Sequence, residues 1–316
     1  MNRATKASAS TIGARCLDEP VIAQRRKHLL AVGALLLGAV AIATSPLFVR
    51  VSETGPVATA FWRAFLALPV LWTWTVFAHG RPHGDGSRSD RGLLIAAGLL
   101  FAGDLAFWHR SIMMTSVANA TLLANLAPIF VALAAWLLLR KRPNRLFLVG
   151  LATALTGMVV LIGGDFKPTN RELLGDVCGV ITAMFYAGYQ VTVTRLRERV
   201  ATATIMAWSG VITAAALLPL ALASGEQMLP ATALGWLNLV GLALIAQVAG
   251  QSLIAYAMAH LPATFSSVGL LFQPVMAALF AWALLGESMG WLQIAGGVAV
   301  LIGIRIAHQA ETLTRR

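Results

Sequence analysis

Apolar residues in this chain are gathered into ten long runs that are separated by short polar segments. The runs cover residues 29–49, 56–78, 92–113, 116–139, 146–164, 173–194, 203–223, 235–258, 262–285 and 289–307. Each run is close to the roughly 20 residues that a helix, rising 1.5 Å per residue, needs to cross about 30 Å of hydrocarbon. The pattern therefore predicts an all-α membrane protein with ten transmembrane helices.

The second half of the chain repeats the first at an offset of 146 residues. The offset aligns residue types that shared hydrophobicity alone does not produce: Gly33 with Gly179, Trp62 with Trp208, Pro128 with Pro274, Trp136 with Trp282, Gly150 with Gly296 and Gly157 with Gly303. Five helices per half is an odd number, so the second half enters the membrane from the opposite side. We expect two inverted five-helix repeats, at 28–165 and 172–308, between a flexible cytoplasmic tail (1–27) and a short cytoplasmic tail (309–316).

Composition agrees with a membrane protein and fixes an orientation. Apolar residues make up 58% of the chain, charged residues only 12%, and the mean hydropathy is +0.75, which excludes a soluble globule. With the N-terminus in the cytoplasm, nineteen of the 24 Lys and Arg residues fall on inner segments, four on outer segments, and Arg63 lies inside a helix. This bias predicts that both termini are cytoplasmic, in a bacterial inner membrane. The net charge of +11 therefore reflects topology, and we expect no nucleic-acid partner.

Several kinds of chemistry are missing from the sequence. The loops between the runs are too short for an extramembrane domain, so any function must lie between the helices. There is no Walker lysine loop, HExxH, GxSxG or cysteine pair with metal spacing, and we predict no catalytic residues, no metal and no cofactor. Cys16 lies in the polar tail and Cys178 in an apolar run, so they form no disulfide framework.

Arg63 and Asp104 are the costly charges within the apolar runs. A charge near the middle of a bilayer costs at least a few kcal/mol unless it is paired or hydrated, so such residues face a bundle interior or a wet cavity. Counting from the run ends places Arg63 about 11 Å and Asp104 about 12 Å below the outer face. Two interpretations remain open: an ion pair that clamps the second helix to the third, or an anion site at Arg63 with Asp104 as its partner or proton carrier.

The third and eighth helices carry corresponding polar stripes. Gln247 and Gln251 are four residues apart on the eighth helix and share a face, as Asp104 and Trp108 do on the third. These stripes fit a central pathway, but the glutamines could equally join helices by hydrogen bonds within the membrane.

Each repeat also carries a proline in the middle of its fourth helix. Pro128 and Pro274 leave the carbonyl groups of the residues four positions earlier without an intrahelical donor and kink the helix. The amides of Asn125 and Gln273 lie beside these kinks. We predict that these residues line a pathway together with a polar strip on the sixth helix, which comprises Tyr186, Tyr189 and Gln190.

Other residues in the runs have ordinary structural interpretations. We expect His109 and Arg110 to lie in the interfacial belt near the outer surface. Gly150 with Gly157, and Gly296 with Gly303, are seven apart on the last helix of each repeat and predict close helix packing, either within the chain or at a dimer contact. A monomer and a homodimer both remain open.

The runs SVANATLLANLAPIF and ATFSSVGLLFQPVMAALFAWALLGE, within two halves of five helices, resemble the EamA-type transporters of the drug/metabolite transporter superfamily. The resemblance covers residues 29 to 307. It implies an inverted-repeat carrier, typically one that exports amino acids, related metabolites or toxic compounds, with a cavity lined by helices three, four, eight and nine. The chain departs from the family pattern at Arg140 and Lys141, where the first repeat often has an acidic residue.

These observations favour a secondary transporter that exports a small organic metabolite or drug by alternating access across the lipid bilayer. Proton antiport, with Asp104 carrying the proton, is a further hypothesis. Two other classes remain open: a membrane-embedded enzyme acting on lipid-linked substrates, which would need acidic or histidine clusters at one membrane face, and a non-transporting membrane receptor.

Overall fold

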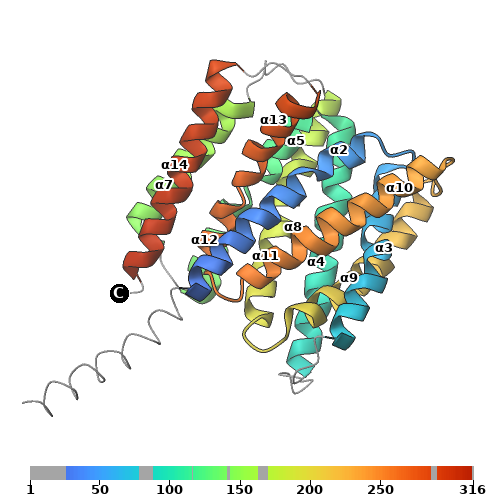
Figure 1. Ribbon diagram of the computed structural model, residues 1–316, viewed down its shortest axis with the longest axis horizontal. Helices are drawn as coiled ribbons and strands as arrows, with labels where there is room; N and C mark the ends of the chain where they lie inside the picture. The colour runs from blue at the N-terminus through green and yellow to red at the C-terminus, as the bar shows by residue number, and fades with distance from the viewer. Residues whose placement is uncertain are drawn as a thin grey trace, which may run out of the picture.

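The computed structural model describes residues 26–77, 88–115, 117–140, 143–162, 170–285 and 290–314 as a bundle of long helices (Figure 1). The first 25 residues of the predicted N-terminal tail lie outside the described part. At the other end, helix α14 continues to Thr314, so the segment after residue 308, which we expected to be a tail, is helical up to that point.

The helices follow one another through both repeats. The first repeat contains a helix over residues 26–43, α2 (Ser45–Arg50), α3 (Pro56–Phe77), α4 (Arg88–Met114), α5 (Val117–Ala124), α6 (Ala127–Leu139) and α7 (Arg145–Ile162). The second contains α8 (Asn170–Leu196), α9 (Thr202–Ala223), α10 (Ala233–Leu242), the π-helix η1 (Ala243–Gln251), α11 (Ser252–Ala257), α12 (Ala263–Gly269), α13 (Phe272–Leu285) and α14 (Trp291–Thr314).

These segments assemble into ten membrane-crossing units. Within the described residues, nine helical spans are long and apolar enough to cross a bilayer, and the apolar helix over Arg145–Leu161 is a shorter tenth. Four spans are assembled from more than one segment: the helix over 26–43 with α2, α5 with α6, α10 with η1 and α11, and α12 with α13. The all-α, ten-helix prediction is confirmed.

The predicted proline kinks are complete breaks. Asn125 and Leu126 form a turn between α5 and α6, and Leu270 and Leu271 form the corresponding turn between α12 and α13. One detail of the prediction is wrong, because the carbonyl of Leu270, which we expected to be free, accepts a hydrogen bond from the backbone amide of Gln273 at 2.9 Å.

The last helices of the two repeats, α7 and α14, cross at their glycines (Figure 1). A Cβ atom on Gly157 would lie 2.7 Å from the carbonyl oxygen of Gly296, and one on Gly303 would lie 2.6 Å from that of Gly150. Any larger side chain would therefore push the two backbones apart. The four glycines that predicted close packing face one another inside a single chain.

The other helices of the two repeats also pack across the repeat boundary. α3 packs on α9, and α4 packs on both α8 and α9. Two buried hydrogen bonds join these helices: Thr213 donates to the carbonyl of Gly98 at 2.9 Å, and Ser111 donates to that of Gly175 at 2.7 Å. The repeats are therefore interleaved, and a space between them is bounded by helices of both.

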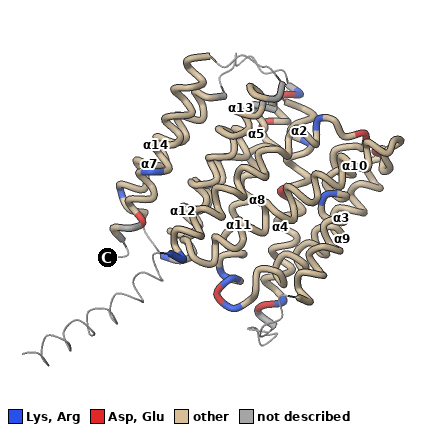
Figure 2. The backbone as a smooth tube through the Cα atoms, viewed as in Figure 1, with Lys and Arg blue, Asp and Glu red and all other residues tan. Residues whose placement is uncertain are grey.

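The bundle has two ends that differ in their charges (Figure 2). We call the end that carries loops 51–55 and 224–232 the Glu53 end. The opposite end, which carries loops 197–201 and 258–262, is called the Arg197 end. The turn between α8 and α9, at the Arg197 end, gathers Arg195, Arg197 and Arg199.

Candidate functional site

A cavity of about 90 Å³ lies between the repeats and is lined by residues of both. Since a single water needs only about 10–15 Å³ of such space, the cavity holds several waters or a small molecule. Its polar and charged lining residues are Ser45, Arg63, Asp104, Thr121, Asn125, Thr182, Tyr186, Gln190, Gln251, Ser267 and Gln273, and its apolar residues include Ile42, Leu105, Trp108, Pro128 and Leu270.

The cavity brings together most of the residues that the sequence singled out for a pathway. The predicted residues in its wall are Arg63, Asp104, Trp108, Asn125, Pro128, Tyr186, Gln190, Gln251 and Gln273. The other three lie behind it. Gln247 contacts Arg63, the Tyr189 hydroxyl contacts the sulfur of Met206 at 3.8 Å, and Pro274 is buried beside the break in its helix.

Arg63 is buried on α3 and held from two sides. Its Nε donates to Oε1 of Gln247 in η1 at 3.2 Å, and its Nη1 donates to Oγ of Ser45 at the start of α2, also at 3.2 Å. Its guanidinium carbon lies 6.0 Å from the centre of the Phe101 ring. Within the described residues Nη2 has no hydrogen-bond partner, so one face of the guanidinium is left for a ligand or water in the cavity.

Asp104 reaches the same cavity from α4. Only 8% of its surface is exposed, and the described residues provide no hydrogen bond or ion pair to its carboxylate. The direct Arg63–Asp104 pair that the depth estimate suggested is therefore not formed in this conformation. Arg63 and Asp104 therefore share one cavity without a direct ion pair, which leaves both within reach of a charged solute.

A polar stripe runs along α8 on the opposite wall. Thr182, Tyr186 and Gln190 are spaced four residues apart, so they share a face of the helix. Their side-chain oxygens, and Oε1 of Gln251 in η1, are buried without a well-formed hydrogen bond among the described residues. Thr182 was missed from the sequence, although its spacing from Tyr186 and Gln190 carried the signal.

The charged, wet cavity between two repeats is what a membrane carrier needs, and comparisons with known proteins agree. The family model described as "EamA-like transporter family" matches the chain twice, over residues 29–163 and 173–307. The chain belongs to the EamA-like transporter family. It is a multi-pass membrane transporter that acts on a small molecule, and not an enzyme.

Relatives of this EamA-family chain are named as transporters. It is 25% identical to an uncharacterised transporter of Archaeoglobus fulgidus, over 88% of this chain and 96% of the relative. It is 27% identical to the pseudopaline exporter CntI of Pseudomonas aeruginosa, over 68% and 74% of the two chains. It is also 27% identical to a probable terminal-alkyne amino-acid exporter of Streptantibioticus cattleyicolor, over 63% and 66%.

A solved structure supports the EamA-family fold directly. A crystal structure of another protein superposes with a TM-score of 0.73 at 17% sequence identity, covering 91% of this chain and 99% of the other. At that identity the likeness concerns the fold alone.

Two features of this EamA-family site differ from the sequence prediction. His109, expected in the interfacial belt, is fully buried, and its Nδ1 lies 2.7 Å from the carbonyl oxygen of Leu105, whereas Arg110 is exposed. The prediction for His109 was wrong because its helix faces the bundle at that turn. The second feature is η1, a π-helix of nine residues within the eighth crossing, which no sequence pattern indicated. π-helical turns are rare and often occur at functional sites, and this one places Gln247 on Arg63.

Proposed function

We propose that this chain is a secondary transporter that moves a small charged organic metabolite through the cavity by alternating access of the two repeats. The observation that supports it is the presence of Arg63 and Asp104, which form no direct ion pair, in a cavity walled by both repeats. Because each repeat contributes to the wall, a relative movement of the repeats would open the cavity to one end of the bundle and close it to the other.

The substrate class follows from the charges in the wall. The free face of Arg63 would bind a carboxylate, and Asp104 would bind a cationic group such as an ammonium. An amino acid or a related compound carries both. The name of one relative, a probable terminal-alkyne amino-acid exporter, supports this class and the direction of export.

The orientation that we propose is the one given by the charge bias of the sequence. Both termini would be cytoplasmic in a bacterial inner membrane, and the Arg197 end would face the cytoplasm. The Glu53 end would then face outward, and its described loops, 51–55 and 224–232, contain no Lys or Arg.

Transport in proteoliposomes tests the site. Vesicles would be loaded with a small-molecule extract from cells, and the solutes that leave would be identified by mass spectrometry. We expect Arg63→Gln and Asp104→Asn each to lower the flux of the carried solute at least tenfold, since each removes a charge from a buried site. The matched control is Arg110→Gln, which removes an exposed arginine of α4 and should leave flux unchanged. Undiminished flux in both cavity variants would reject the cavity as the transport site.

Coupling to protons is the second part of the proposal. Asp104 is the described carboxylate in the cavity wall, so it is the group placed to exchange a proton for solute. An imposed pH gradient should accelerate export by the wild type, while Asp104→Asn should abolish that acceleration. Equal acceleration of any residual flux in the variant would assign the proton to another group.

A further inference from the structure

The oxygens on the α8 wall are a cluster that the bundle itself does not use. Thr182 and Gln190 are each 1% exposed and Gln251 is 2% exposed, so bulk solvent does not reach them. The Thr182 hydroxyl, the Tyr186 hydroxyl and the side-chain carbonyl oxygens of Gln190 and Gln251 have no well-formed hydrogen bond among the described residues, and the Tyr186 hydroxyl and the Gln251 side chain lie close to each other. Buried polar groups in folded proteins are normally hydrogen-bonded, and an unpaired one is costly.

Aromatic ring contacts and the π-helix η1 position this cluster. The Tyr186 ring stacks on that of Tyr189 at a centroid distance of 6.1 Å, and the Tyr189 ring contacts that of Phe101 in a tilted arrangement at 4.8 Å. Gln251 ends the π-helix whose earlier residue Gln247 holds Arg63. The unpaired oxygens are therefore on rigid elements and share a cavity with the charged groups.

Other threonines of α8 show that unpaired oxygens are not a general property of this helix. Thr192 donates to the carbonyl of Gly188 at 2.8 Å, and Thr194 donates to that of Gln190 at 2.8 Å. Thr182 could donate to the preceding turn in the same way, yet it does not. The hydroxyl that lines the cavity is the one left without a partner.

We infer that Thr182, Tyr186, Gln190 and Gln251 form a second subsite, which binds hydrogen-bonding groups on the part of the solute remote from its charges. The inference rests on the proposed function and narrows its substrate to small polar zwitterions, as opposed to zwitterions with aliphatic side chains. A site built to hydrogen-bond a hydroxyl or amide discriminates strongly against an analogue that lacks it, because the buried groups of the site are then left unpaired.

Two pairs of amino acids of matched shape test this subsite. Threonine and valine differ by a hydroxyl in place of a methyl, and asparagine and leucine differ by an amide in place of a branched alkyl group. Proteoliposomes loaded with all four would be assayed together for efflux, with protein-free vesicles subtracted. We expect threonine to leave at least about tenfold faster than valine, and asparagine at least about tenfold faster than leucine.

Variants test whether the polar side chains of the cavity wall cause the preference for polar over apolar amino acids. Tyr186→Phe, Thr182→Val and Gln190→Leu each remove one unpaired group and should reduce the polar-to-apolar ratio severalfold, mainly by slowing the polar member. Tyr256→Phe and Thr192→Val are the matched controls, since Tyr256 is exposed on α11 and Thr192 is already paired within its helix. Both controls should keep the wild-type ratio.

The outcomes separate this subsite from the carrier itself. Equal or faster efflux of valine and leucine would overturn the polar subsite while leaving the carrier in place. A ratio that is unchanged in all three wall variants would also overturn it. Efflux of none of the four would reject small polar zwitterions as the substrate, and the flux of other solutes from the loaded cell extract would then decide whether the carrier proposal survives.

Discussion

The two repeats are joined by different chemistry at the two ends of the bundle. At the Glu53 end, each repeat caps a helix of the other through a carboxylate. Glu226 accepts hydrogen bonds from the backbone amides of Val57 and Ala58 at the start of α3, at 2.8 and 3.1 Å. Glu53 accepts hydrogen bonds from the amides of Ala231 and Thr232, and from the Thr232 hydroxyl, at the start of α10.

Further polar contacts join the same loops. The Trp62 indole donates to the carbonyl of Met228 at 2.6 Å, and the Gly55 amide donates to that of Gln227 at 3.0 Å. Trp62 precedes Arg63, so the loop of the second repeat also fixes the helix turn that presents the cation.

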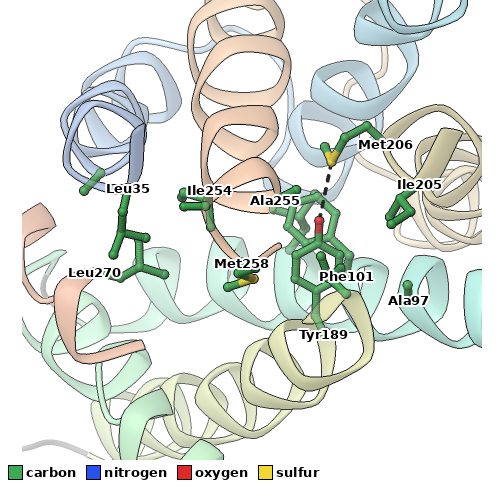
Figure 3. Packing of buried hydrophobic residues seen from close by; sticks show 14 of the residues in the cluster. Leu35, Ala97, Phe101, Tyr189, Ile205, Met206, Ile254, Ala255, Met258 and Leu270 are labelled. Carbon is green, nitrogen blue, oxygen red and sulfur yellow. Dashed lines mark hydrogen bonds between the residues drawn. The ribbon is translucent and has the colours of Figure 1, made fainter. Parts of the chain in front are cut away.

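Toward the Arg197 end the contacts between the repeats are apolar. One buried cluster contains Leu35, Phe101, Tyr189, Met206, Ile254, Met258 and the cavity-lining Leu270, each no more than 3% exposed (Figure 3). They come from helices of both repeats. Within this group the dashed contact drawn is the weak one from the Tyr189 hydroxyl to Met206.

This difference indicates which end of the bundle can open with the smaller loss of free energy. Glu53 and Glu226 are half-buried, so water can reach them and replace much of their hydrogen bonding when the ends separate. Separating the packed side chains would instead expose apolar surface, at about 25 cal/mol per Å². We call the hydrogen-bonded contacts of Glu53 and Glu226 the latch, and the apolar packing around Phe101 the seal.

The largest effect is expected from breaking the seal. Phe101→Ala should lower the free energy of unfolding by about 3–5 kcal/mol, because it removes a buried ring and leaves a space between α4 and α8. Denaturant unfolding in detergent micelles measures it. Phe77→Ala is the matched control, since that ring is 88% exposed and should cost far less. Equal losses in the two variants would mean that the packing is no seal.

A smaller effect is expected from the latch. Glu226→Ala should lower the free energy of unfolding by about 0.5–2 kcal/mol, the usual cost of losing a helix N-cap. Gln227→Ala keeps the backbone carbonyl that binds Gly55 and removes only an exposed side-chain hydrogen bond to the Leu229 carbonyl, so its stability should stay close to that of the wild type. A Glu226 variant as stable as this control would show that the carboxylate does not hold α3.

The smallest effect is a pH dependence at Glu53. The hydrogen bond from the Thr232 hydroxyl, aided by the Thr232 and Ala231 amides, lowers the pKa of Glu53 below its ordinary value of 4.5. A carboxylate whose pKa is lowered by folding stabilises the fold above that value, and the contribution is lost as the pH falls through the lowered pKa. The unfolding temperature should therefore fall on acidification below about pH 4.5.

Two variants assign this pH dependence. Glu53→Gln should remove part of the acid-induced fall in unfolding temperature. Glu198→Gln, which changes an exposed glutamate at the Arg197 end, should retain it in full. Identical acid profiles for the two variants would show that Glu53 does not contribute.

The sequence predicted the architecture because the duplicated tryptophans, prolines and glycines and the length of the apolar runs depend on order along the chain. It also predicted most of the polar residues in the cavity wall, since polar groups are rare in such runs and face the interior of the bundle. The sequence could not predict the side-chain contacts that depend on how neighbouring helices are rotated about their axes. The contact of Arg63 with Gln247 in place of Asp104 needs the π-helix, and Ser45 reaches Arg63 only because a short helix follows the turn at Thr44.

The latch was equally hidden from the sequence. Glu53 and Glu226 lie in short polar loops far apart in the chain, and nothing in their local sequence marks a contact with another helix. Only the inverted packing of the repeats, which brings the α3 and α10 termini together, shows what they do.

Alternating access requires one cavity that opens in turn to each side of the membrane. Thr121→Cys, in a chain whose two native cysteines are replaced by serine, places a thiol in the cavity wall. Thr153→Cys places one at a half-buried position of α7 outside the cavity lining, as a control. A small charged thiol reagent, added to one side of oriented vesicles at a time during solute flux, should label the cysteine at 121 from both sides and the cysteine at 153 from neither. Labelling at 121 from a single side only, whatever solute gradient is imposed, would contradict alternating access.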